Sequence, residues 1–266
     1  MTGTVPDSLF CISGKEKESA EAINRLELFT AVFSILTGGK MPFVERVRKG
    51  FACLSMACGS IGREERRKMQ AMLYMLATKF PGQKEPEKIM EEIMKKALVV
   101  IDMQNDFITG VLGNEECMKI VPNVVKRVQK AVEDKVDIIF SQDTHQEDYL
   151  FTQEGRKLPI RHCIQDTKGW EIIPELAEIA KKNGTVFLKD AFGSRSMAEY
   201  MKDHNYEEIE MIGVCTDICV ISNAMTIKSF APESEISVKE SCCAGVTPQS
   251  HRTAIEAMKA CQINII

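Results

Sequence analysis

Residues 213–220 read Gly213-Val214-Cys215-Thr216-Asp217-Ile218-Cys219-Val220 and carry the strongest structural signal in the chain. The apolar run 209–214 is typical of a buried strand, and after a tight turn a cysteine stands where the next helix is expected to begin. A helix N-terminus has partial positive charge and free backbone N–H groups. We therefore expect the Cys219 thiol to shift toward the nucleophilic thiolate, with N–H groups nearby that can hold an oxyanion.

The same alternation of strand and helix patterns extends from residue 97 to residue 266. Strands are expected at 97–101, 136–141, 185–188, 209–214, 235–238 and 263–266, and helices at 121–133, 172–182, 196–204, 219–229 and 250–261. Apolar strands that alternate with helices indicate a mostly parallel sheet covered on both faces. The sequence thus predicts an α/β fold with a three-layer, doubly wound sheet for residues 97–266.

Residues 1–96 have a different pattern, which is helical throughout and rich in methionine, and we predict a separate all-helical N-terminal region. Its segments 68–80 and 87–93 resemble the C-terminal helical part of bacterial PD-(D/E)XK nuclease/transposase-type proteins. The nuclease core of that family is not evident, so this resemblance implies no activity. The region could serve oligomerisation, support a lid over the substrate or be a remnant of a fusion, and a homo-oligomer is one expectation.

The composition argues against several classes of protein. The net charge of −4 provides no basic field for nucleic acid, and no apolar run reaches the roughly 18–20 residues that span a bilayer. Residues 1–14 lack the charged and apolar parts of a signal peptide, so we expect a cytoplasmic protein. The ten cysteines are scattered and lack the spacing of a disulfide framework. The expected partner is a small molecule, not a nucleic acid or a membrane.

Three chemically useful side chains follow three of the expected strands. Asp102 follows the first strand, Lys189 follows the third, and Cys219 lies beyond the fourth. Because sites in parallel sheets form at the carboxyl ends of the strands, we expect these side chains to meet. A carboxylate can accept the thiol proton, and a lysine ammonium between the two would stabilise both anions and lower the thiol pKa.

Each of these residues also has an ordinary structural interpretation. An aspartate after a strand usually caps a helix or forms a turn, and a lysine at that place is usually solvated. A cysteine in a first helical turn is usually only a small side chain. The joint placement of the three residues favours catalysis.

A second polar cluster follows the second expected strand. Asp143 and His145 stand two residues apart, so they lie on the same side of an extended segment, and Glu154 and His162 follow within the next loop. Two imidazoles and two carboxylates suit Zn²⁺, Mn²⁺ or Fe²⁺ better than Ca²⁺. A polar surface loop without a metal is the alternative. Cys163 is expected to point away from the cluster, because neighbouring side chains diverge in an extended chain.

These segments together resemble the isochorismatase-like cysteine hydrolases, and within them the nicotinamidases, over essentially all of residues 97–266. The resemblance is carried by Val100-Ile101-Asp102-Met103-Gln104-Asn105-Asp106-Phe107, Asp143-Thr144-His145, Leu188-Lys189 and Gly213 through Cys219. It implies that Asp102 is the base, Lys189 the bridging cation and Cys219 the nucleophile. It also implies a cis peptide between Val214 and Cys215, with the N–H groups of Cys215 and Cys219 facing the oxyanion.

The resemblance to nicotinamidases also implies one divalent metal ion, with zinc expected first and manganese or iron as alternatives. The metal would ligate the pyridine nitrogen of the substrate, and its ligands here would be Asp143, His145, Glu154 and His162. Phe107 is expected to wall the ring pocket, and Trp170 to approach it.

The reaction implied is hydrolysis of nicotinamide to nicotinate and ammonia through a cysteine thioester. The nucleophilic cysteine argues for an amide or related C–N hydrolase, because true isochorismatases lack it. A metal-independent cysteine amidohydrolase of the same fold, acting on a ureido or carbamoyl compound, is one alternative. A degenerate hydrolase domain that acts as a binding protein is another.

Overall fold

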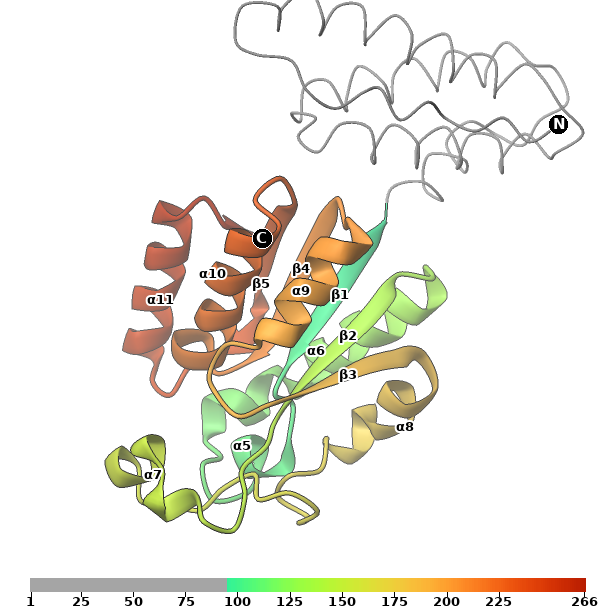
Figure 1. Cartoon of the computed structure of the whole chain (residues 1–266). Coiled ribbons are helices and arrows are strands. Elements are labelled where there is room, and N and C mark those ends of the chain that lie inside the picture. The colour runs from blue at the N-terminus through green and yellow to red at the C-terminus, as the bar shows by residue number, and fades with distance from the viewer. Residues whose placement is uncertain (1–94) are drawn as a thin grey trace, which may run out of the picture. The chain divides into compact units, whose positions relative to one another are not determined.

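The computed structural model describes residues 95–266 (Figure 1), and the predictions for the N-terminal helical region lie outside the described residues. Six strands form one sheet: β1 (Lys96–Ile101), β2 (Asp137–Asp143), β3 (Gly184–Lys189), β4 (Glu208–Val214), β5 (Glu235–Ala244) and β6 (Asn264–Ile265). Their order is β3-β2-β1-β4-β5-β6, and every neighbouring pair is parallel. The predicted α/β fold with a doubly wound sheet is confirmed, and the domain boundary after residue 96 stays a prediction.

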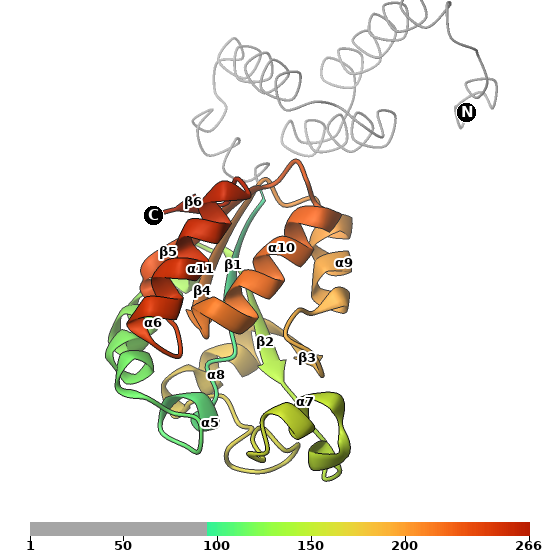
Figure 2. The ribbon, with the colours of Figure 1, turned by 90° about the vertical axis from the view of Figure 1, so that its left-hand side faces the viewer.

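Helices cover both faces of the sheet. The longer ones are α6 (Glu115–Glu133), α8 (Pro174–Asn183), α9 (Arg195–His204), α10 (Ile221–Phe230) and α11 (Pro248–Ala260). Figures 1 and 2 show α9, α10 and α11 on one face and α6 and α8 on the other. Among the described residues, no helix is long and apolar enough to cross a membrane.

The two core layers follow from the two-residue period of the strands. In β1, Ala97, Val99 and Ile101 pack in the core with α9, α10 and α11, whereas Leu98 and Val100 pack with α6 and α8. All five side chains are buried. A strand buried on both faces needs apolar residues at every position, and this explains the unbroken apolar run that follows Lys96.

Element boundaries differ from the sequence-based expectations at several places. Helix α6 begins six residues earlier than expected, because Asn114 caps it by accepting a hydrogen bond of 2.9 Å from the backbone N–H of Cys117. Strand β5 is longer than expected and ends at Ala244. Four short elements were not anticipated: α5 (Asn105–Ile108), η2 (Tyr149–Phe151), α7 (Gln153–Lys157) and the π-helical turn η3 (Thr216–Val220).

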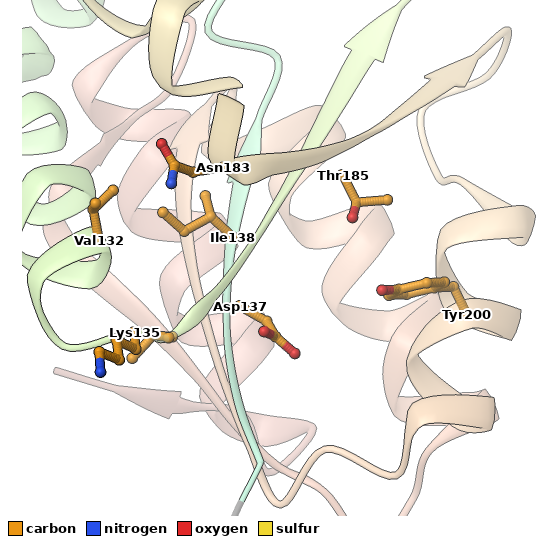
Figure 3. A pocket seen from close by; sticks show the side chains of 8 residues that line it. Val132, Lys135, Asp137, Ile138, Asn183, Thr185 and Tyr200 are labelled. Atoms are coloured by element: carbon orange, nitrogen blue, oxygen red, sulfur yellow. The ribbon is translucent and has the colours of Figure 1, made fainter. Parts of the chain in front are cut away.

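The described residues enclose cavities at opposite ends of the strands. A cavity of about 300 Å³ lies where β2 and β3 begin and includes Lys135, Asp137 and Tyr200 in its lining (Figure 3). A cavity of about 1020 Å³ lies at the opposite ends of these strands, with Asp143 and the residues that follow Lys189 in its lining. The carboxyl edge of a parallel sheet is the usual place for a ligand, and here it holds the larger hollow.

Gly213 occupies a position that no other residue type suits. It has a φ of +120°, and a Cβ atom there would lie 2.1 Å from the backbone oxygen of Ile101. Glycine therefore allows β4 to stay in register with β1 up to the turn that carries the cysteines.

Gly213→Ala is expected to lower the free energy of unfolding by about 3 kcal/mol, because the methyl group meets backbone and the φ is unfavourable. Denaturant unfolding measures the change. Gly193→Ala is the control, because its methyl group meets first the hydroxyl of Thr226 and its backbone conformation is ordinary. Equal stability of the two variants would contradict this account of Gly213.

Candidate active site

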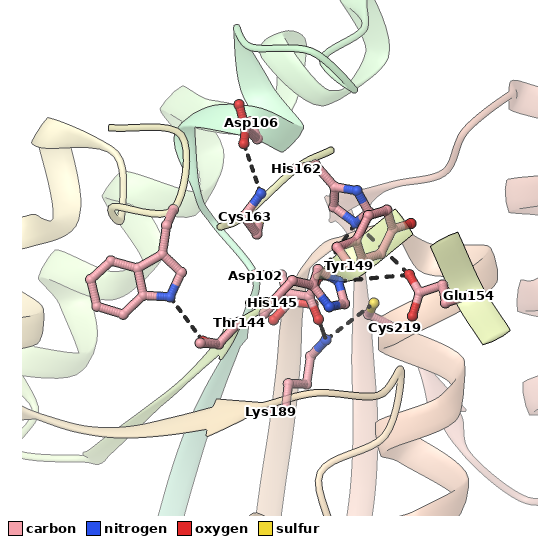
Figure 4. A network of polar contacts seen from close by, with 12 residues as sticks. Asp102, Asp106, Thr144, His145, Tyr149, Glu154, His162, Cys163, Lys189 and Cys219 are labelled. Carbon is pink, nitrogen blue, oxygen red and sulfur yellow. Dashed lines mark hydrogen bonds and ion pairs between the residues drawn. The ribbon is translucent and has the colours of Figure 1, made fainter. Parts of the chain in front are cut away.

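The structure brings Asp102, Lys189 and Cys219 together at the carboxyl edge of the sheet. The Lys189 Nζ atom lies 2.8 Å from Asp102 Oδ2 and 3.5 Å from Cys219 Sγ. Figure 4 shows the three side chains close to one another. All three side chains are buried. The ammonium group thus contacts both the carboxylate and the thiol, as expected from the sequence.

The two oxygens of Asp102 have different surroundings. Oδ1 accepts a 2.7 Å hydrogen bond from the hydroxyl of Ser141 on the neighbouring strand β2. Oδ2 contacts the Lys189 ammonium but has no hydrogen bond of good geometry among the described residues. Oδ2 is therefore the oxygen with capacity left to accept a proton.

Burial sets the protonation states of the three groups. It raises the pKa of Asp102, and Lys189 opposes this only in part. It also raises the pKa of Cys219 well above its usual value, and the negative charge of Asp102 adds to the effect. For Lys189 burial acts in the opposite direction, but Asp102 and Cys219 outweigh it, so the pKa is raised and the ammonium form persists.

The expectation of a stabilised thiolate at Cys219 is therefore wrong for the resting site. A helix start and a lysine both favour the thiolate, but complete desolvation and a neighbouring carboxylate favour the neutral thiol more strongly. The Cys219 thiol thus has a raised pKa and lies beside a carboxylate whose pKa is also raised.

The turn that carries Cys219 has an unusual backbone. The peptide bond between Val214 and Cys215 is cis, and η3 is a π-helical turn that leads directly into α10. The Cys215 carbonyl accepts hydrogen bonds from the N–H groups of Ile218 and Val220. The Asp217 carboxylate accepts from the N–H of Val246, and this bond ties the turn to the loop after β5.

The predicted metal ligands also meet. Asp143, His145 and His162 form a buried group whose ligand atoms all lie within 4.8 Å of one another. The Nε2 atoms of His145 and His162 lie 3.0 and 3.6 Å from Asp143 Oδ2, and 3.7 and 3.8 Å from Glu154 Oε1. Ligands at about 2.1 Å from a tetrahedral ion are about 3.4 Å apart, so this spacing fits a zinc-sized ion.

The hydrogen bonds around the histidines support the same interpretation. His162 Nδ1 lies 2.8 Å from the backbone oxygen of Ile160, so this nitrogen carries the proton and Nε2 is left as a ligand. The buried Nε2 atom of His145 has no hydrogen bond of good geometry among the described residues. A buried nitrogen without a hydrogen-bond partner, surrounded by residue types that commonly ligate metals, is expected where a metal ion would bind.

Asp143 belongs to both groups of residues. Its Oδ1 atom accepts a 2.8 Å hydrogen bond from Lys189 Nζ, while Oδ2 faces the two histidines. Burial opposes ionisation of Asp143, but the neighbouring His145 and Lys189 outweigh it and lower the pKa. The ionised Asp143 carboxylate thus connects the group of possible metal ligands with the lysine beside Cys219.

The larger cavity opens onto both groups. Cys219, Cys215, Asp143, His145, Glu154 and His162 all contribute to its lining. Phe107 lines it as well, with its ring edge-on to His162 at a centroid distance of 5.7 Å. An amide can therefore reach the thiol while an aromatic ring lies beside Phe107 and the histidines.

Trp170 does not line this cavity, so the expectation for it is wrong. Its indole N–H donates a 2.8 Å hydrogen bond to the Thr144 hydroxyl, and its ring packs against the core on the α6 side. Trp170 supports the segment after β2 from behind. The position of Trp170 in the sequence does not show on which side of that segment its side chain packs.

Two features of the site were missed from the sequence. Glu154 lies on the short helix α7, capped by Thr152, and not in an irregular loop. Ser141 donates a hydrogen bond to the Asp102 carboxylate, and the detectable signal was a hydroxyl directly after the apolar residues of a buried strand. Cys163 is buried and does not belong to the group of possible ligand atoms, and its N–H donates to Asp106 at 2.8 Å.

Comparisons with known proteins agree with this geometry. A nicotinamidase/pyrazinamidase structure from Bacillus subtilis is 26% identical, covers 65% of this chain and 99% of its own, and has a TM-score of 0.59. A pyrazinamidase structure from Pyrococcus horikoshii in complex with zinc is 26% identical over 65% of this chain and 98% of its own, with a TM-score of 0.56. Nicotinamidase 1 of Arabidopsis thaliana is 26% identical over 64% of this chain and 77% of its own length.

The model of the isochorismatase domain matches residues 96–266, the same residues that form the sheet, its helices and the site. Since that match covers well over half of the chain and contains each residue of the cluster, the chain belongs to the isochorismatase family.

Proposed function

We propose that this amide-bond hydrolase converts nicotinamide and water to nicotinate and ammonia through a thioester on Cys219. One observation carries the proposal: a group of possible metal ligands shares Asp143 with the lysine that contacts Cys219, and both the ligand group and Cys219 line one cavity. The nicotinamidases among the similar proteins support the choice of substrate.

The first half of the reaction forms the thioester. Asp102 Oδ2 takes the proton of Cys219, and the thiolate attacks the carboxamide carbon. Lys189 stays charged and stabilises both anions as the proton moves. The backbone N–H groups of Cys215 and Cys219 hold the tetrahedral oxyanion.

The second half releases both products. The C–N bond breaks, and ammonia leaves with the proton that Asp102 took from the thiol. The ionised Asp102 then removes a proton from water, which attacks the thioester carbon. Nicotinate leaves, and Cys219 recovers its proton from Asp102, so the site returns to its starting state.

The divalent ion would be held by Asp143, His145, Glu154 and His162. It would act as a Lewis acid toward the pyridine nitrogen. This chain's own contribution is to place the ring: Phe107 lies against His162, and the cavity connects that place with Cys219. Zinc is proposed first, since the similar pyrazinamidase structure contains it.

An ammonia-release screen over nicotinamide, pyrazinamide and simple ureido compounds tests the substrate directly. Turnover of nicotinamide at a higher kcat/KM than the ureido compounds is expected. Preference for a ureido or carbamoyl compound would overturn the assignment in favour of another amidohydrolase. Absence of turnover on all of them would favour a binding protein.

Cys219→Ala is expected to lower ammonia release by at least roughly 10³-fold, because it removes the thiol that contacts Lys189 and that is proposed to form the thioester. Cys243→Ala is the matched control, since Cys243 is also a buried thiol of the core on the α9 side but does not line the cavity. It should keep the activity of the wild type. Unfolding curves of both variants separate loss of chemistry from loss of fold, and retained turnover in Cys219→Ala would refute the mechanism.

Removing the metal is expected to abolish nicotinamide turnover, because the ring loses the ligand that places its carboxamide beside Cys219. Protein purified without chelators is analysed for metal, treated with a chelator, and reloaded separately with Zn²⁺, Mn²⁺ and Fe²⁺. His162→Ala should show the same loss without a chelator. Undiminished turnover in metal-free protein would instead favour the metal-independent alternative.

The pH profile of kcat/KM is expected to show its acid limb above the usual range of an aspartate, because burial raises the pKa of Asp102 and the base must be ionised. The hydrogen bond from Ser141 favours the ionised form, so Ser141→Ala should raise this pKa further. Activity is then lost at higher pH as the medium is acidified. An acid limb that stays in place, or moves to lower pH, would exclude Asp102 as the base.

A further inference from the structure

The side chain of Gln104 makes an unusual set of contacts beside the site. Gln104 lies two residues beyond Asp102, and its side chain is fully buried. Its Oε1 atom accepts a 2.7 Å hydrogen bond from the N–H of Asp143, and its Nε2 atom donates to the carbonyl of the same residue at 2.9 Å. Nε2 also donates to the carbonyl of Trp170 at 2.8 Å.

These contacts continue the sheet past the point where its backbone pairing stops. The last backbone pair between β1 and β2 is Ile101 with Ser141, and Asp143 lies two residues further along β2. β1 has left the sheet there, so the N–H and carbonyl of Asp143 face the gap. A primary amide presents one donor and one acceptor side by side, as a peptide group does, and Gln104 fills this gap.

The orientation of the amide is determined by its partners. With oxygen and nitrogen exchanged, an NH₂ group would face the Asp143 N–H, and an oxygen would face two carbonyls. Three hydrogen bonds thus hold the amide in one orientation. Asp143 in turn is held by Gln104 on one side and paired with Lys189 of β3 on the other.

We propose that Gln104 is a positioning residue that holds the Asp143 carboxylate between the metal ligands and Lys189. The inference rests on the proposed function, because it takes Asp143 as a metal ligand and as a partner of the lysine beside Cys219. One Asp143 oxygen lies 2.8 Å from Lys189 Nζ and the other 3.0 Å from His145 Nε2. A backbone that shifts at Asp143 moves both contacts together.

The test compares Gln104→Met with Gln142→Met in the full-length chain. Gln142 is a buried glutamine that directly precedes Asp143 on β2. Its side chain donates to the same Trp170 carbonyl at 2.8 Å, but it makes no hydrogen bond to Asp143. Both substitutions keep the length of the side chain and remove a donor to Trp170. Only Gln104→Met removes the hydrogen bonds to Asp143.

Three measurements are made on each variant: the zinc dissociation constant by competition with a chromogenic chelator, the unfolding midpoint without metal, and kcat and KM for nicotinamide at saturating zinc. Both variants should lose some thermal stability. Gln104→Met alone should bind zinc about 10–100-fold more weakly, the usual effect of losing a group that orients a ligand. Its kcat should stay below that of the wild type even at saturating zinc, because the Asp143–Lys189 contact is displaced.

Equal zinc affinity in Gln104→Met and the wild type would overturn the proposal, as would an equal loss in both variants, since either result leaves Gln104 a purely structural role. If Gln104→Met does not fold, Gln104→Glu with its control Gln142→Glu carries the same comparison, because glutamate keeps the acceptor for Asp143 N–H and loses the donor. Zinc binding without nicotinamide turnover in the wild type would refute the function and leave the affinity comparison valid. Absence of zinc binding in the wild type would refute the metal site and this inference together.

Discussion

The buried ammonium group of Lys189 is the interaction on which the rest of the site depends. It lies 2.8 Å from one oxygen of Asp102, 2.8 Å from one oxygen of Asp143 and 3.5 Å from Cys219 Sγ. Two carboxylates buried at this edge would repel each other without a cation between them. The charge of Lys189 therefore allows Asp143 to remain ionised and brings Asp102 close to the thiol.

The arrangement divides the work between two carboxylates in different environments. Asp143 lies between His145 and Lys189, which lower its pKa, and this favours a ligand role. Asp102 is more completely buried, and its pKa is raised, as expected of a group that accepts and returns a proton. The neutral resting thiol of Cys219 fits this division, because its proton has a nearby acceptor.

Much of the fold could be predicted because the sequence pattern is local. Buried strands such as 97–101 are continuous apolar runs, and their ends place Asp102, Asp143 and Lys189 at one edge whatever the exact packing. Other features depend on partners far away along the chain. The hydrogen bond of Trp170 to Thr144 and the hydrogen bonds of Gln104 to Asp143 leave no periodic signal.

The sequence by itself determined which chemical groups are available and at which strand ends they stand, because apolar runs mark the strands locally and the side chains that follow them stand at the carboxyl edge of a parallel sheet. Only the tertiary structure decided their protonation and orientation. Whether a cysteine at a helix start is a thiolate depends on how much water and which charges surround it, and here desolvation and Asp102 outweigh Lys189. Trp170 packs behind the site for the same kind of reason, since its indole N–H finds its partner only in the folded chain.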